Sequence, residues 1–541
     1  MAVALPSIFR EKDPDIVSTH DGDSFVFPYL SQRAHAAGIL DQLVLDREAA
    51  PVRVYELDGH SYFSYGKILY RETAARLQGR LHIDENNAFI TRDCGLDGLV
   101  EIARTCIVPV QKASRATIGT NMTSLQFYEA VKHDVLIPWN KNKPEEWKDA
   151  GELVDADRGG FVYEPSPGIY DNVGELDFSS LYPMIMLREN LSGETVKCQC
   201  CPDSAWRVPE LGYNICQRWQ GIVPRSLEIL LRKRILLKQQ IKQYKEDGVS
   251  PAAWERLDRR QAALKWILVC SFGYLGFKNA RFGKIDAHIA TCAFSRKILG
   301  RATAIAALRG FELVHGIVDS LWLRKPGARP EDFQRLSMEV GSELELPISF
   351  EGQYRWIVFL NSKIYPRIPV LNRYYGVLDN GTVKVRGIEL RRHDTPGIVK
   401  ECQADMLGVL SRARDSFEFK ALIPQALSVL RRYVEMVREK AVPLEEMIVA
   451  KNLSKNPDDY SKRVPQAVAA RLLVKEGGQV HAGQSIDFIL TRKKGAVPVE
   501  LADEDLDYDW ERYGELLVSS AENLLLPLGY DKDVLRKTVR L

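Results

Sequence analysis

Residues 311–323 read FELVHGIVDSLWL, an apolar stretch with the period-two character of a core β-strand, and Asp319 stands in its middle. A carboxylate is costly to bury without a partner or a bound cation. A residue in the middle of a strand has no helix to cap, so structural roles for Asp319 are few. We therefore interpret Asp319 as a residue kept for its chemistry.

A second carboxylate, Asp177, lies in GELDFSSLYP, residues 174–183. It follows an apolar strand and precedes the Ser-Ser start of a helix, and by itself it would be interpreted as a helix N-cap. If Asp177 and Asp319 converge at one edge of a sheet, they form a hard-oxygen site suited to Mg²⁺. Two such ions about 4 Å apart can activate a hydroxyl and neutralise a leaving phosphate.

Residues 222–247 and 252–277 have helical spacing and are joined by EDGVSP, which predicts an antiparallel helical hairpin. Arg234 and Lys238 share one face of the first helix, as Gln261 and Lys265 do on the second. Facing each other, they would form a cationic groove for a triphosphate, and the alternative is a solvated basic face. Tyr182, one turn after Asp177, is either a core aromatic or a ring under a sugar that excludes a 2′-hydroxyl.

The 541 residues carry a net charge of only +2, so any basic surface must be local. No apolar run approaches the ~18 residues of a membrane span, and MAVALPSIFREKDPD has no signal-peptide pattern. We therefore expect a cytoplasmic, nucleoid-associated protein without membrane contact. The chain predicts an α+β fold: paired strands at GGFVYEP and GIYDNVGELDF, a helix over 285–309, strands over 354–390, and mainly helices over 391–541.

Four of the nine cysteines, Cys198, Cys200, Cys201 and Cys216, form a local cluster. Four thiolates could bind zinc. However, CQCC lacks the two-residue gap of the usual zinc knuckle, and adjacent cysteines rarely ligate the same ion. Free thiols in a reducing cytoplasm are the other interpretation from the residues alone.

Three segments carry a family resemblance: DFSSLYP (177–183), LKWILVCSFGYLGFKNARFG (264–283) and VHGIVDSLWL (314–323). In this order they resemble the polymerase motifs of family B DNA polymerases. Further segments are similar to other parts of that family: REKDPDIVSTHDGDSFVFPYL to the second exonuclease motif region, GGFVYEP to the template-contacting linker, GIVPRSLEILLRKRILLK to the first fingers helix, NRYYGVLDNGTVKVRGIELRRHD to the palm–thumb junction, and VPQAVAARL with YDWERY to the thumb.

The resemblance implies a right-hand polymerase fold with a degenerate RNase H-like exonuclease domain at the N-terminus. The implied divisions are an exonuclease-like domain (1–115), a linker (116–160), palm (161–220 and 282–370), fingers (221–281), and palm–thumb junction with thumb (371–541).

The resemblance also implies roles for individual residues. Asp177 and Asp319 match the catalytic metal ligands, with the backbone of Phe178 also facing the metal. The implied nucleotide-binding residues are Phe178, Ser179, Ser180, Leu181, Tyr182, Arg234, Lys238, Lys265, Val269 and Phe272. The implied DNA-binding residues are Gly159, Gly160, Arg373, Tyr375 and Arg386. The implied cofactor is a pair of Mg²⁺ ions, for which Mn²⁺ can substitute; the partners are primer–template DNA and dNTPs, with a sliding clamp or accessory proteins as further candidates.

The chain departs from the family pattern at several positions. Ile317 stands where the third motif usually has its first aspartate, and Val269 and Phe272 replace the usual asparagine and tyrosine of the second, so we expect a looser, slower site. From the resemblance we expect the first exonuclease motif to be missing, with the chain beginning after it, while Val26 stands at the aspartate of the second and Asp93 matches the third. These losses resemble the shortened, exonuclease-deficient branch found in archaea and some bacteria. In relatives a disulfide can occur near the cysteine cluster, with Cys201 and Cys216 as the matching pair.

We therefore predict a template-directed DNA polymerase without proofreading, of low efficiency, with a role in translesion synthesis or repair. The alternative is a catalytically decayed DNA-binding subunit, favoured by Ile317 and Val269. A nuclease is disfavoured by Val26 and the missing first motif.

Overall fold

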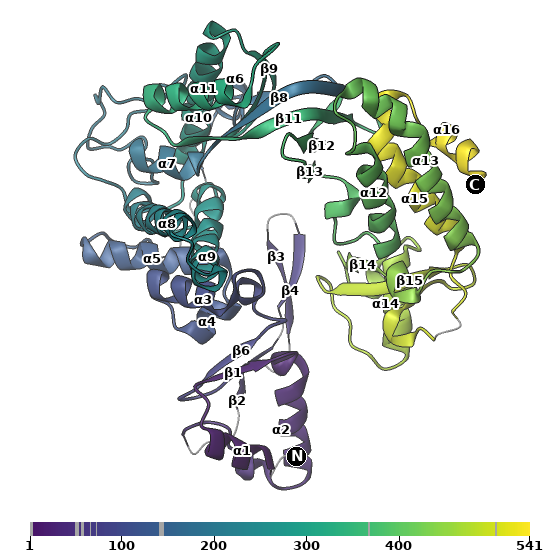
Figure 1. Cartoon of the computed structure of the whole chain (residues 1–541). Coiled ribbons are helices and arrows are strands. Elements are labelled where there is room, and N and C mark those ends of the chain that lie inside the picture. Colours follow the sequence, from purple (N-terminus) through teal and green to yellow (C-terminus); the bar gives the residue numbers. More distant parts are fainter. Residues whose placement is uncertain are drawn as a thin grey trace. The chain divides into compact units, whose positions relative to one another are not determined.

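The computed structural model describes residues 4–48, 53–55, 59–64, 67–71, 73–139, 145–365, 368–503 and 506–541 (Figure 1). The chain forms two compact units. Unit 1 comprises Met1–Gly59, Glu72–Phe161 and Ser179–Arg301, and unit 2 comprises His60–Arg71, Val162–Phe178 and Ala302–Leu541. Both units are therefore assembled from separate stretches of chain.

Unit 1 is mainly helical. Its longer helices are α1 (Ala4–Lys12), α2 (Phe27–Ala36), α3 (Phe89–Cys106), α4 (Val110–Arg115), α5 (Ile118–Lys132), α6 (Ala150–Ala156), α7 (Leu181–Arg188), α8 (Ile222–Glu246), α9 (Pro251–Leu275) and most of α10 (Ile285–Leu308). It also has a single π-helical turn η1 (Gly22–Val26), a 3₁₀ turn η2 (Leu40–Gln42), and strands β1 (Ile16–Thr19), β2 (Arg53–Tyr55), β5 (Ala74–Arg76) and β6 (Leu81–Asp84). Strand β1 pairs in parallel with β6, and β2 pairs with β5.

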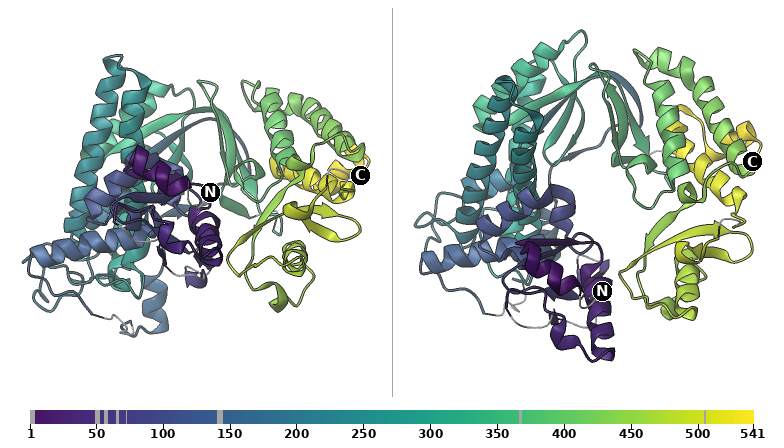
Figure 2. Two further views of the ribbon diagram at one scale, coloured as in Figure 1. Left: turned by 90° about the horizontal axis from the view of Figure 1, so that it is seen from below. Right: turned by 60° about the horizontal axis from the view of Figure 1, so that its bottom comes forward.

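Helices α8 and α9 form the predicted antiparallel hairpin and run side by side in each view (Figures 1 and 2). Leu and Ile side chains recur on one face of α8 and are buried there. Pro251 begins α9, a position where its missing N–H costs no hydrogen bond. The predicted helix over 285–309 is confirmed as α10.

Unit 2 is built on a seven-stranded sheet with the order β13-β12-β11-β8-β10-β9-β7. Its strands are β7 (Val162–Tyr163), β8 (Gly168–Phe178), β9 (Glu312–Ile317), β10 (Ser320–Arg324), β11 (Ile348–Asn361), β12 (Pro369–Leu378) and β13 (Val383–Arg386). All neighbours in this sheet are antiparallel. The central strand is β8, which pairs with β10 on one side and β11 on the other.

The rest of unit 2 supplies helices and small strands. The helices are α11 (Pro330–Leu344), α12 (Gly397–Leu410), α13 (Ser416–Arg438), α14 (Pro465–Lys475), α15 (Trp510–Leu525) and α16 (Lys532–Val539). The short 3₁₀ turns are η3 (Glu389–Arg391), η4 (Leu444–Met447), η5 (Pro457–Asp459), η6 (Val499–Leu501) and η7 (Leu526–Leu528). The remaining strands are the hairpin β3 (His60–Ser64) and β4 (Lys67–Arg71), and the three-stranded sheet of β14 (Val449–Asn452), β15 (Ser485–Thr491) and β16 (Gly495–Pro498).

Helix α11 packs on the seven-stranded sheet through Phe333, whose ring stacks on Phe350 of β11. Gly174 of β8 makes room for it, because an added Cβ there would come within 2.3 Å of the Phe333 ring. At the other end of the sheet, Trp356 and Tyr375 join the large apolar core that α12, α13 and α15 share. This packing fixes β8, the strand that carries Asp177.

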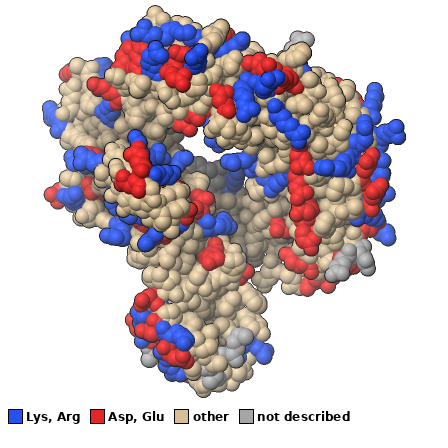
Figure 3. All heavy atoms as spheres, in the orientation of Figure 1, with Lys and Arg blue, Asp and Glu red and all other residues tan. Residues whose placement is uncertain are grey.

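The α+β prediction is confirmed, and one strand pairing in it is wrong. GGFVYEP and GIYDNVGELDF were expected to pair with each other, but β7 pairs with β9 instead. The buried ring of His315 on β9 lies 2.8 Å from the Tyr163 carbonyl oxygen and holds β7 at that edge. In the described part of the chain, no helix is long and apolar enough to cross a membrane. Figure 3 shows both signs of charge mixed over the visible face, in line with the small net charge.

Candidate active site

The two predicted carboxylates lie on neighbouring segments where the central strands of the seven-stranded sheet end. Asp177 is the second-last residue of β8, opposite Ser320, the first residue of β10. Asp319 immediately precedes Ser320, and its carbonyl oxygen accepts a 2.8 Å hydrogen bond from the Phe178 N–H. The expected convergence of Asp177 and Asp319 is therefore present in the backbone.

Asp319 does not lie within a strand, as the apolar alternation predicted. It occupies the two-residue turn between β9 and β10. The turn residue before it, Val318, has a φ of 55°, which is rare and strained for a β-branched side chain. The turn holds no glycine or proline, so the residues that usually mark a reversal are missing from the sequence here. Strain of this kind persists where surrounding structure enforces it, and it is frequent at functional sites.

The Asp177 carboxylate sits in a partly buried, negatively charged environment. Burial raises its pKa, a hydrogen bond from Ser320 Oγ to Oδ1 (2.6 Å) lowers it, and the negative charge of Glu351 raises it further. Such surroundings favour a bound cation, because the cation offsets both the burial and the repulsion between carboxylates. Carboxylate oxygens are the ligands that Mg²⁺ and Mn²⁺ take. The residues present fit a divalent ion of this class.

Glu351 is a residue that the sequence reasoning missed. It is the bulge residue of β11: Phe350 pairs with Leu176 and Gly352 with Glu175, so Glu351 has no partner of its own on β8. A β-bulge redirects a side chain, and bulges are frequent beside active sites. Ser349 Oγ donates to Glu351 (2.7 Å) and lies 3.4 Å from the Asp177 carbonyl oxygen. Only the sheet register identifies it, since nothing in ISFEGQY marks one glutamate above others.

Ile317, at the position where the resemblance leads us to expect a second aspartate, has an apolar role. It packs against the buried cluster of Val173, Val314, Trp322, Tyr354, Ile357, Phe359 and Tyr374. A carboxylate at this position would lie against these side chains at a cost in solvation. The substitution therefore agrees with the packing around it.

Arg234 on α8 is half-buried and makes side-chain hydrogen bonds to two neighbours. Its Nη1 donates to Ser180 Oγ at 2.9 Å and its Nε to Gln261 Oε1 on α9 at 3.2 Å. Burial lowers its pKa. The hydrogen bond to Ser180 places the guanidinium beside the N-terminus of α7, where unpaired backbone N–H groups favour anions.

Lys238 and Lys265 are exposed on α8 and α9. A neighbouring face of the hairpin packs on α3: Lys233 and Arg260 both pair with Glu101 of α3 at distances of 3.0 and 2.8 Å. These two cations are therefore engaged in structural contacts, whereas Arg234 points to another face of α8. The interpretation of a merely solvated basic face is thus weaker for Arg234 than for the two lysines.

The segment after Asp177 offers its backbone rather than its side chains. The Phe178 and Leu181 side chains are 1% and 2% exposed, so they belong to the core. Ser179 is half-buried, and Ser180 has a φ of 56° at the start of α7. That the backbone groups of 178–181 face the ligand stays a prediction.

Tyr182 lies in an aromatic cluster with a glycine close to its hydroxyl. Its ring is 4.3 Å from that of Phe272, which stacks on His288 at 3.9 Å. A Cβ added to Gly160 would come within 2.3 Å of the Tyr182 hydroxyl oxygen. The neighbouring Gly159 has a φ of 65°, and its carbonyl accepts a hydrogen bond from Arg296. The structure therefore brings Gly160, Tyr182 and Phe272 together.

Val269, on the same helix as Phe272, is 59% exposed. Single exposed apolar residues are common on protein surfaces, so the ligand-facing role that the resemblance implies for Val269 stays a prediction.

The predicted DNA-binding residues of unit 2 differ in their exposure and in their partners. Arg373 Nε donates to the Gly387 carbonyl (3.0 Å), and burial lowers the pKa of Arg373. Arg386, on β13, is exposed. Tyr375 is completely buried, and its hydroxyl donates to the Leu524 carbonyl at 2.6 Å. Its side chain thus joins the sheet to α15 and is no contact for DNA in this structure.

The N-terminal part of unit 1 holds a buried charge cluster. Asp23 is fully buried and forms a two-pronged pair with Arg115, with distances of 2.6 and 3.0 Å. The Asp23 N–H donates to Asp84 Oδ2 at 2.6 Å. Val26 packs on the local apolar core, and Asp93 accepts a hydrogen bond from Trp266 of α9. The acidic groups here are therefore engaged in structural contacts.

Comparison with known proteins gives a consistent result. The family model "DNA polymerase family B" matches residues 108–518, and "DNA polymerase family B, exonuclease domain" matches residues 4–92. "DNA polymerase 1" of Pyrococcus abyssi is 26% identical over 99% of this chain and 74% of its own length. "DNA polymerase 2" of Saccharolobus solfataricus is 31% identical over 66% of this chain and 51% of its own length.

A solved structure shares the fold. The family B DNA polymerase from the hyperthermophilic archaeon Pyrobaculum calidifontis superposes with a TM-score of 0.68 at 24% identity, covering 98% of this chain and 72% of the other.

Proposed function

Because the chain belongs to DNA polymerase family B, we propose that it extends a primer 3′-hydroxyl with dNTPs by two-metal phosphoryl transfer, with Asp177 and Asp319 as the metal-binding carboxylates. The observation that carries this proposal is the joint between the end of β8 and the β9–β10 turn. There a backbone hydrogen bond, Ser320 and the bulged Glu351 gather carboxylates at one edge of the sheet.

Each residue then has a defined task. Mg²⁺, or Mn²⁺ in its place, would be held by Asp177, Asp319 and the Phe178 backbone and would supply Lewis-acid activation of the 3′-hydroxyl and neutralisation of the leaving group. Ser320 keeps the Asp177 carboxylate oriented and ionised. Arg234, Lys238 and Lys265 bind the triphosphate, helped by the backbone of 178–181. Tyr182, with Phe272 beneath it, lies against the sugar and excludes ribonucleotides.

We also propose that the enzyme lacks proofreading. Val26 provides no ligand, the Asp23 carboxylate is neutralised by Arg115, and Asp93 accepts a hydrogen bond from Trp266. Metal-dependent hydrolysis needs carboxylates that can turn to an ion, and these are committed to protein partners. The matching measurement is release of a labelled 3′-terminal nucleotide from primed DNA without dNTPs, with a proofreading relative as positive control. Release at the relative's rate would refute this part.

A role on damaged templates follows as a finer proposal. An exposed valine at position 269 and a phenylalanine at 272 leave fewer polar contacts to test the geometry of the nascent pair. We expect the ratio of extension rates opposite an abasic site and an intact base to be higher than for a proofreading relative.

The decisive experiment is primer extension with Mg²⁺ and four dNTPs, comparing the wild type with Asp319→Ala. Asp458→Ala, an exposed carboxylate with only a 3.9 Å contact to Arg471, is the matched control. We expect extension by the wild type and the control, and none by Asp319→Ala, while all three bind primer–template equally in fluorescence anisotropy. Binding without extension by the wild type would instead support a DNA-binding subunit that has lost catalysis, which Ile317 in its apolar cluster favours.

A further inference from the structure

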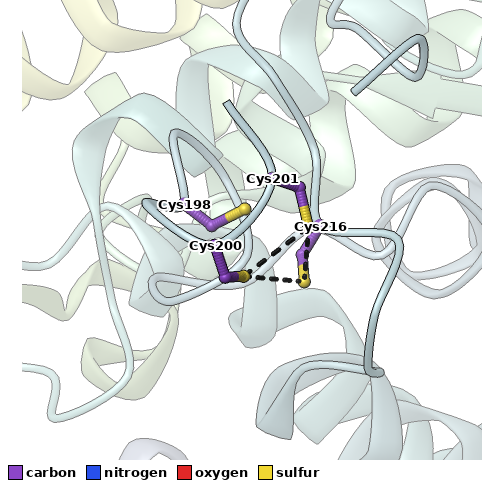
Figure 4. A group of neighbouring side chains, drawn as sticks. All are labelled: Cys198, Cys200, Cys201 and Cys216. Atoms are coloured by element: carbon purple, nitrogen blue, oxygen red, sulfur yellow. Dashed lines mark hydrogen bonds between the residues drawn. The ribbon is translucent and has the colours of Figure 1, made fainter. Parts of the chain in front are cut away.

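The four cysteines of the local cluster converge on one point (Figure 4). The sulfur atoms of Cys198, Cys200, Cys201 and Cys216 all lie within 4.8 Å of one another. Cys200 Sγ is 3.6 Å from both Cys201 Sγ and Cys216 Sγ, and the latter two are 3.8 Å apart. All nine cysteines of the chain are free thiols in this structure.

The three separations among Cys200, Cys201 and Cys216 match one face of a tetrahedral metal site, and Cys198 supplies the fourth sulfur within 4.8 Å of the others. Four sulfurs about 2.3 Å from a tetrahedral zinc ion stand about 3.8 Å apart, since a tetrahedron's edge is about 1.6 times its centre-to-corner distance. We propose that Cys198, Cys200, Cys201 and Cys216 bind one structural Zn²⁺ ion. Neither the catalytic proposal nor the family matches assign this site.

The chain conformation explains how adjacent cysteines can both point inward, against the expectation from CQCC. Lys197 has a φ of 54° and reverses the chain just before the cluster. The Asn214 amide donates to the carbonyl oxygens of Cys198 and Cys201, each at 2.9 Å. A β-bridge between Val196 and Ile215 then brings Cys216 beside the loop. The missing two-residue gap in CQCC does not prevent convergence, because the tight loop sets the directions of the cysteine side chains.

The thiols are suited to a cation. The Gln217 N–H donates a hydrogen bond to Cys201. Thiols that ligate a metal give up their protons as the ion binds. Zinc binding only displaces protons and needs no oxidant, whereas a Cys201–Cys216 disulfide needs an electron acceptor and leaves two thiols beside it. Four sulfur ligands select zinc or iron over hard metals.

The site lies at the start of the helical hairpin. The Cys216 carbonyl accepts a 3.1 Å hydrogen bond from the Asn190 amide, and Asn190 Oδ1 accepts one of 2.8 Å from the Gly221 N–H. Gly221 is the N-cap of α8, the helix that carries Arg234. Zinc would therefore close the loop of residues 198–216 and fix the base of α8.

The test is metal analysis of the full chain, expressed with zinc and passed through gel filtration with a mild chelator. We expect about one zinc per chain in the wild type and in Cys270→Ser, a half-buried cysteine outside the cluster, and less than about a tenth as much in Cys200→Ser and Cys216→Ser. Stripping the wild type with a thiol-reactive mercurial and a strong chelator should lower its melting temperature, and added zinc should restore it.

Two results would overturn the proposal, and neither depends on polymerase activity. One is wild-type protein without zinc whose peptide map links Cys201 to Cys216. The other is zinc retained in full by both serine variants. If the variants fail to fold, Co²⁺ titration of the stripped wild type decides: an intense sulfur-to-cobalt charge-transfer band with tetrahedral d–d bands supports the site, and their absence refutes it. Iron at full occupancy would overturn the choice of zinc.

Discussion

The contact between Gly160 and Tyr182 permits a strict test of the sugar-binding proposal. In Gly160→Ala, the new Cβ would lie 2.3 Å from the Tyr182 hydroxyl oxygen, while the next atom of that ring, Cζ, is 3.6 Å away. Ordinary contact begins near 3.4 Å, so the hydroxyl must move by about 1 Å. Overpacking of this size costs about 1–3 kcal/mol. Displacing the ring from the sugar should therefore lower kcat/KM for dNTPs by about ten-fold or more and relax discrimination against rNTPs.

The clash involves only the hydroxyl, so removing it should rescue the variant. In a Tyr182→Phe background the added Cβ meets nothing closer than 3.6 Å, and Gly160→Ala should have almost no effect there. Single-nucleotide incorporation with dNTP and rNTP, measured for all four proteins, gives a coupling energy expected at about 1–3 kcal/mol. Gly408→Ala, at an open position where nothing lies within 4 Å of the new Cβ, is the control. Equal losses for Gly160→Ala in both backgrounds would refute the reasoning.

Three further changes test the surroundings of the site. Ser320→Ala removes the hydrogen bond that lowers the pKa of Asp177. The pKa of Asp177, already raised by burial, should rise further, and the acidic limb of the kcat/KM profile should move to higher pH. Ser428→Ala on α13, whose hydroxyl donates to the Pro424 carbonyl, should leave that limb in place. Lys384→Met leaves Glu175 buried without its 2.7 Å ion pair. Chemical denaturation should show a free energy of unfolding lower by roughly 3 kcal/mol, and the double variant with Glu175→Gln should largely recover it. Arg234→Lys keeps the charge but loses the fork that reaches Ser180 and Gln261 and holds the cation in place. We expect the free energy of dNTP binding to weaken by about 1.5 kcal/mol, so KM for dNTPs should rise roughly ten-fold at unchanged melting temperature.

Features that depend on local pattern could be predicted from the sequence. The hairpin of α8 and α9 follows from helical spacing around a turn-rich break, and Asp177 at the end of β8 follows from an apolar strand before a helix start. The resemblance added the pairing of Asp177 with Asp319. These features depend on a few residues that are close in the sequence, so the local sequence is enough to predict them.

Features that depend on register and contact could not be predicted. The reversal at Val318 and Asp319 is invisible because this turn holds no glycine or proline, the residues that usually mark a turn in a sequence. Glu351 becomes significant only when β11 bulges against β8, and the burial of Tyr375 depends on a helix about 150 positions away along the chain. The same holds for CQCC, where a side-chain amide at Asn214 sets the directions of the thiols.

The separated segments of unit 2 have a consequence for how the protein is made. Strand β8 leaves the ribosome about 140 residues before β10 and about 170 before β11, its two neighbours in the sheet. At about 5–20 residues per second, this interval lasts roughly 10–30 seconds. During it both edges of an eleven-residue strand, including the apolar stretch from Val173 to Leu176, have no native partner and could join another chain. The remaining stretches of unit 1 are completed in the same interval. Recovery of active enzyme should therefore depend strongly on synthesis rate and temperature, with nascent-chain aggregation and not the finished fold setting the yield.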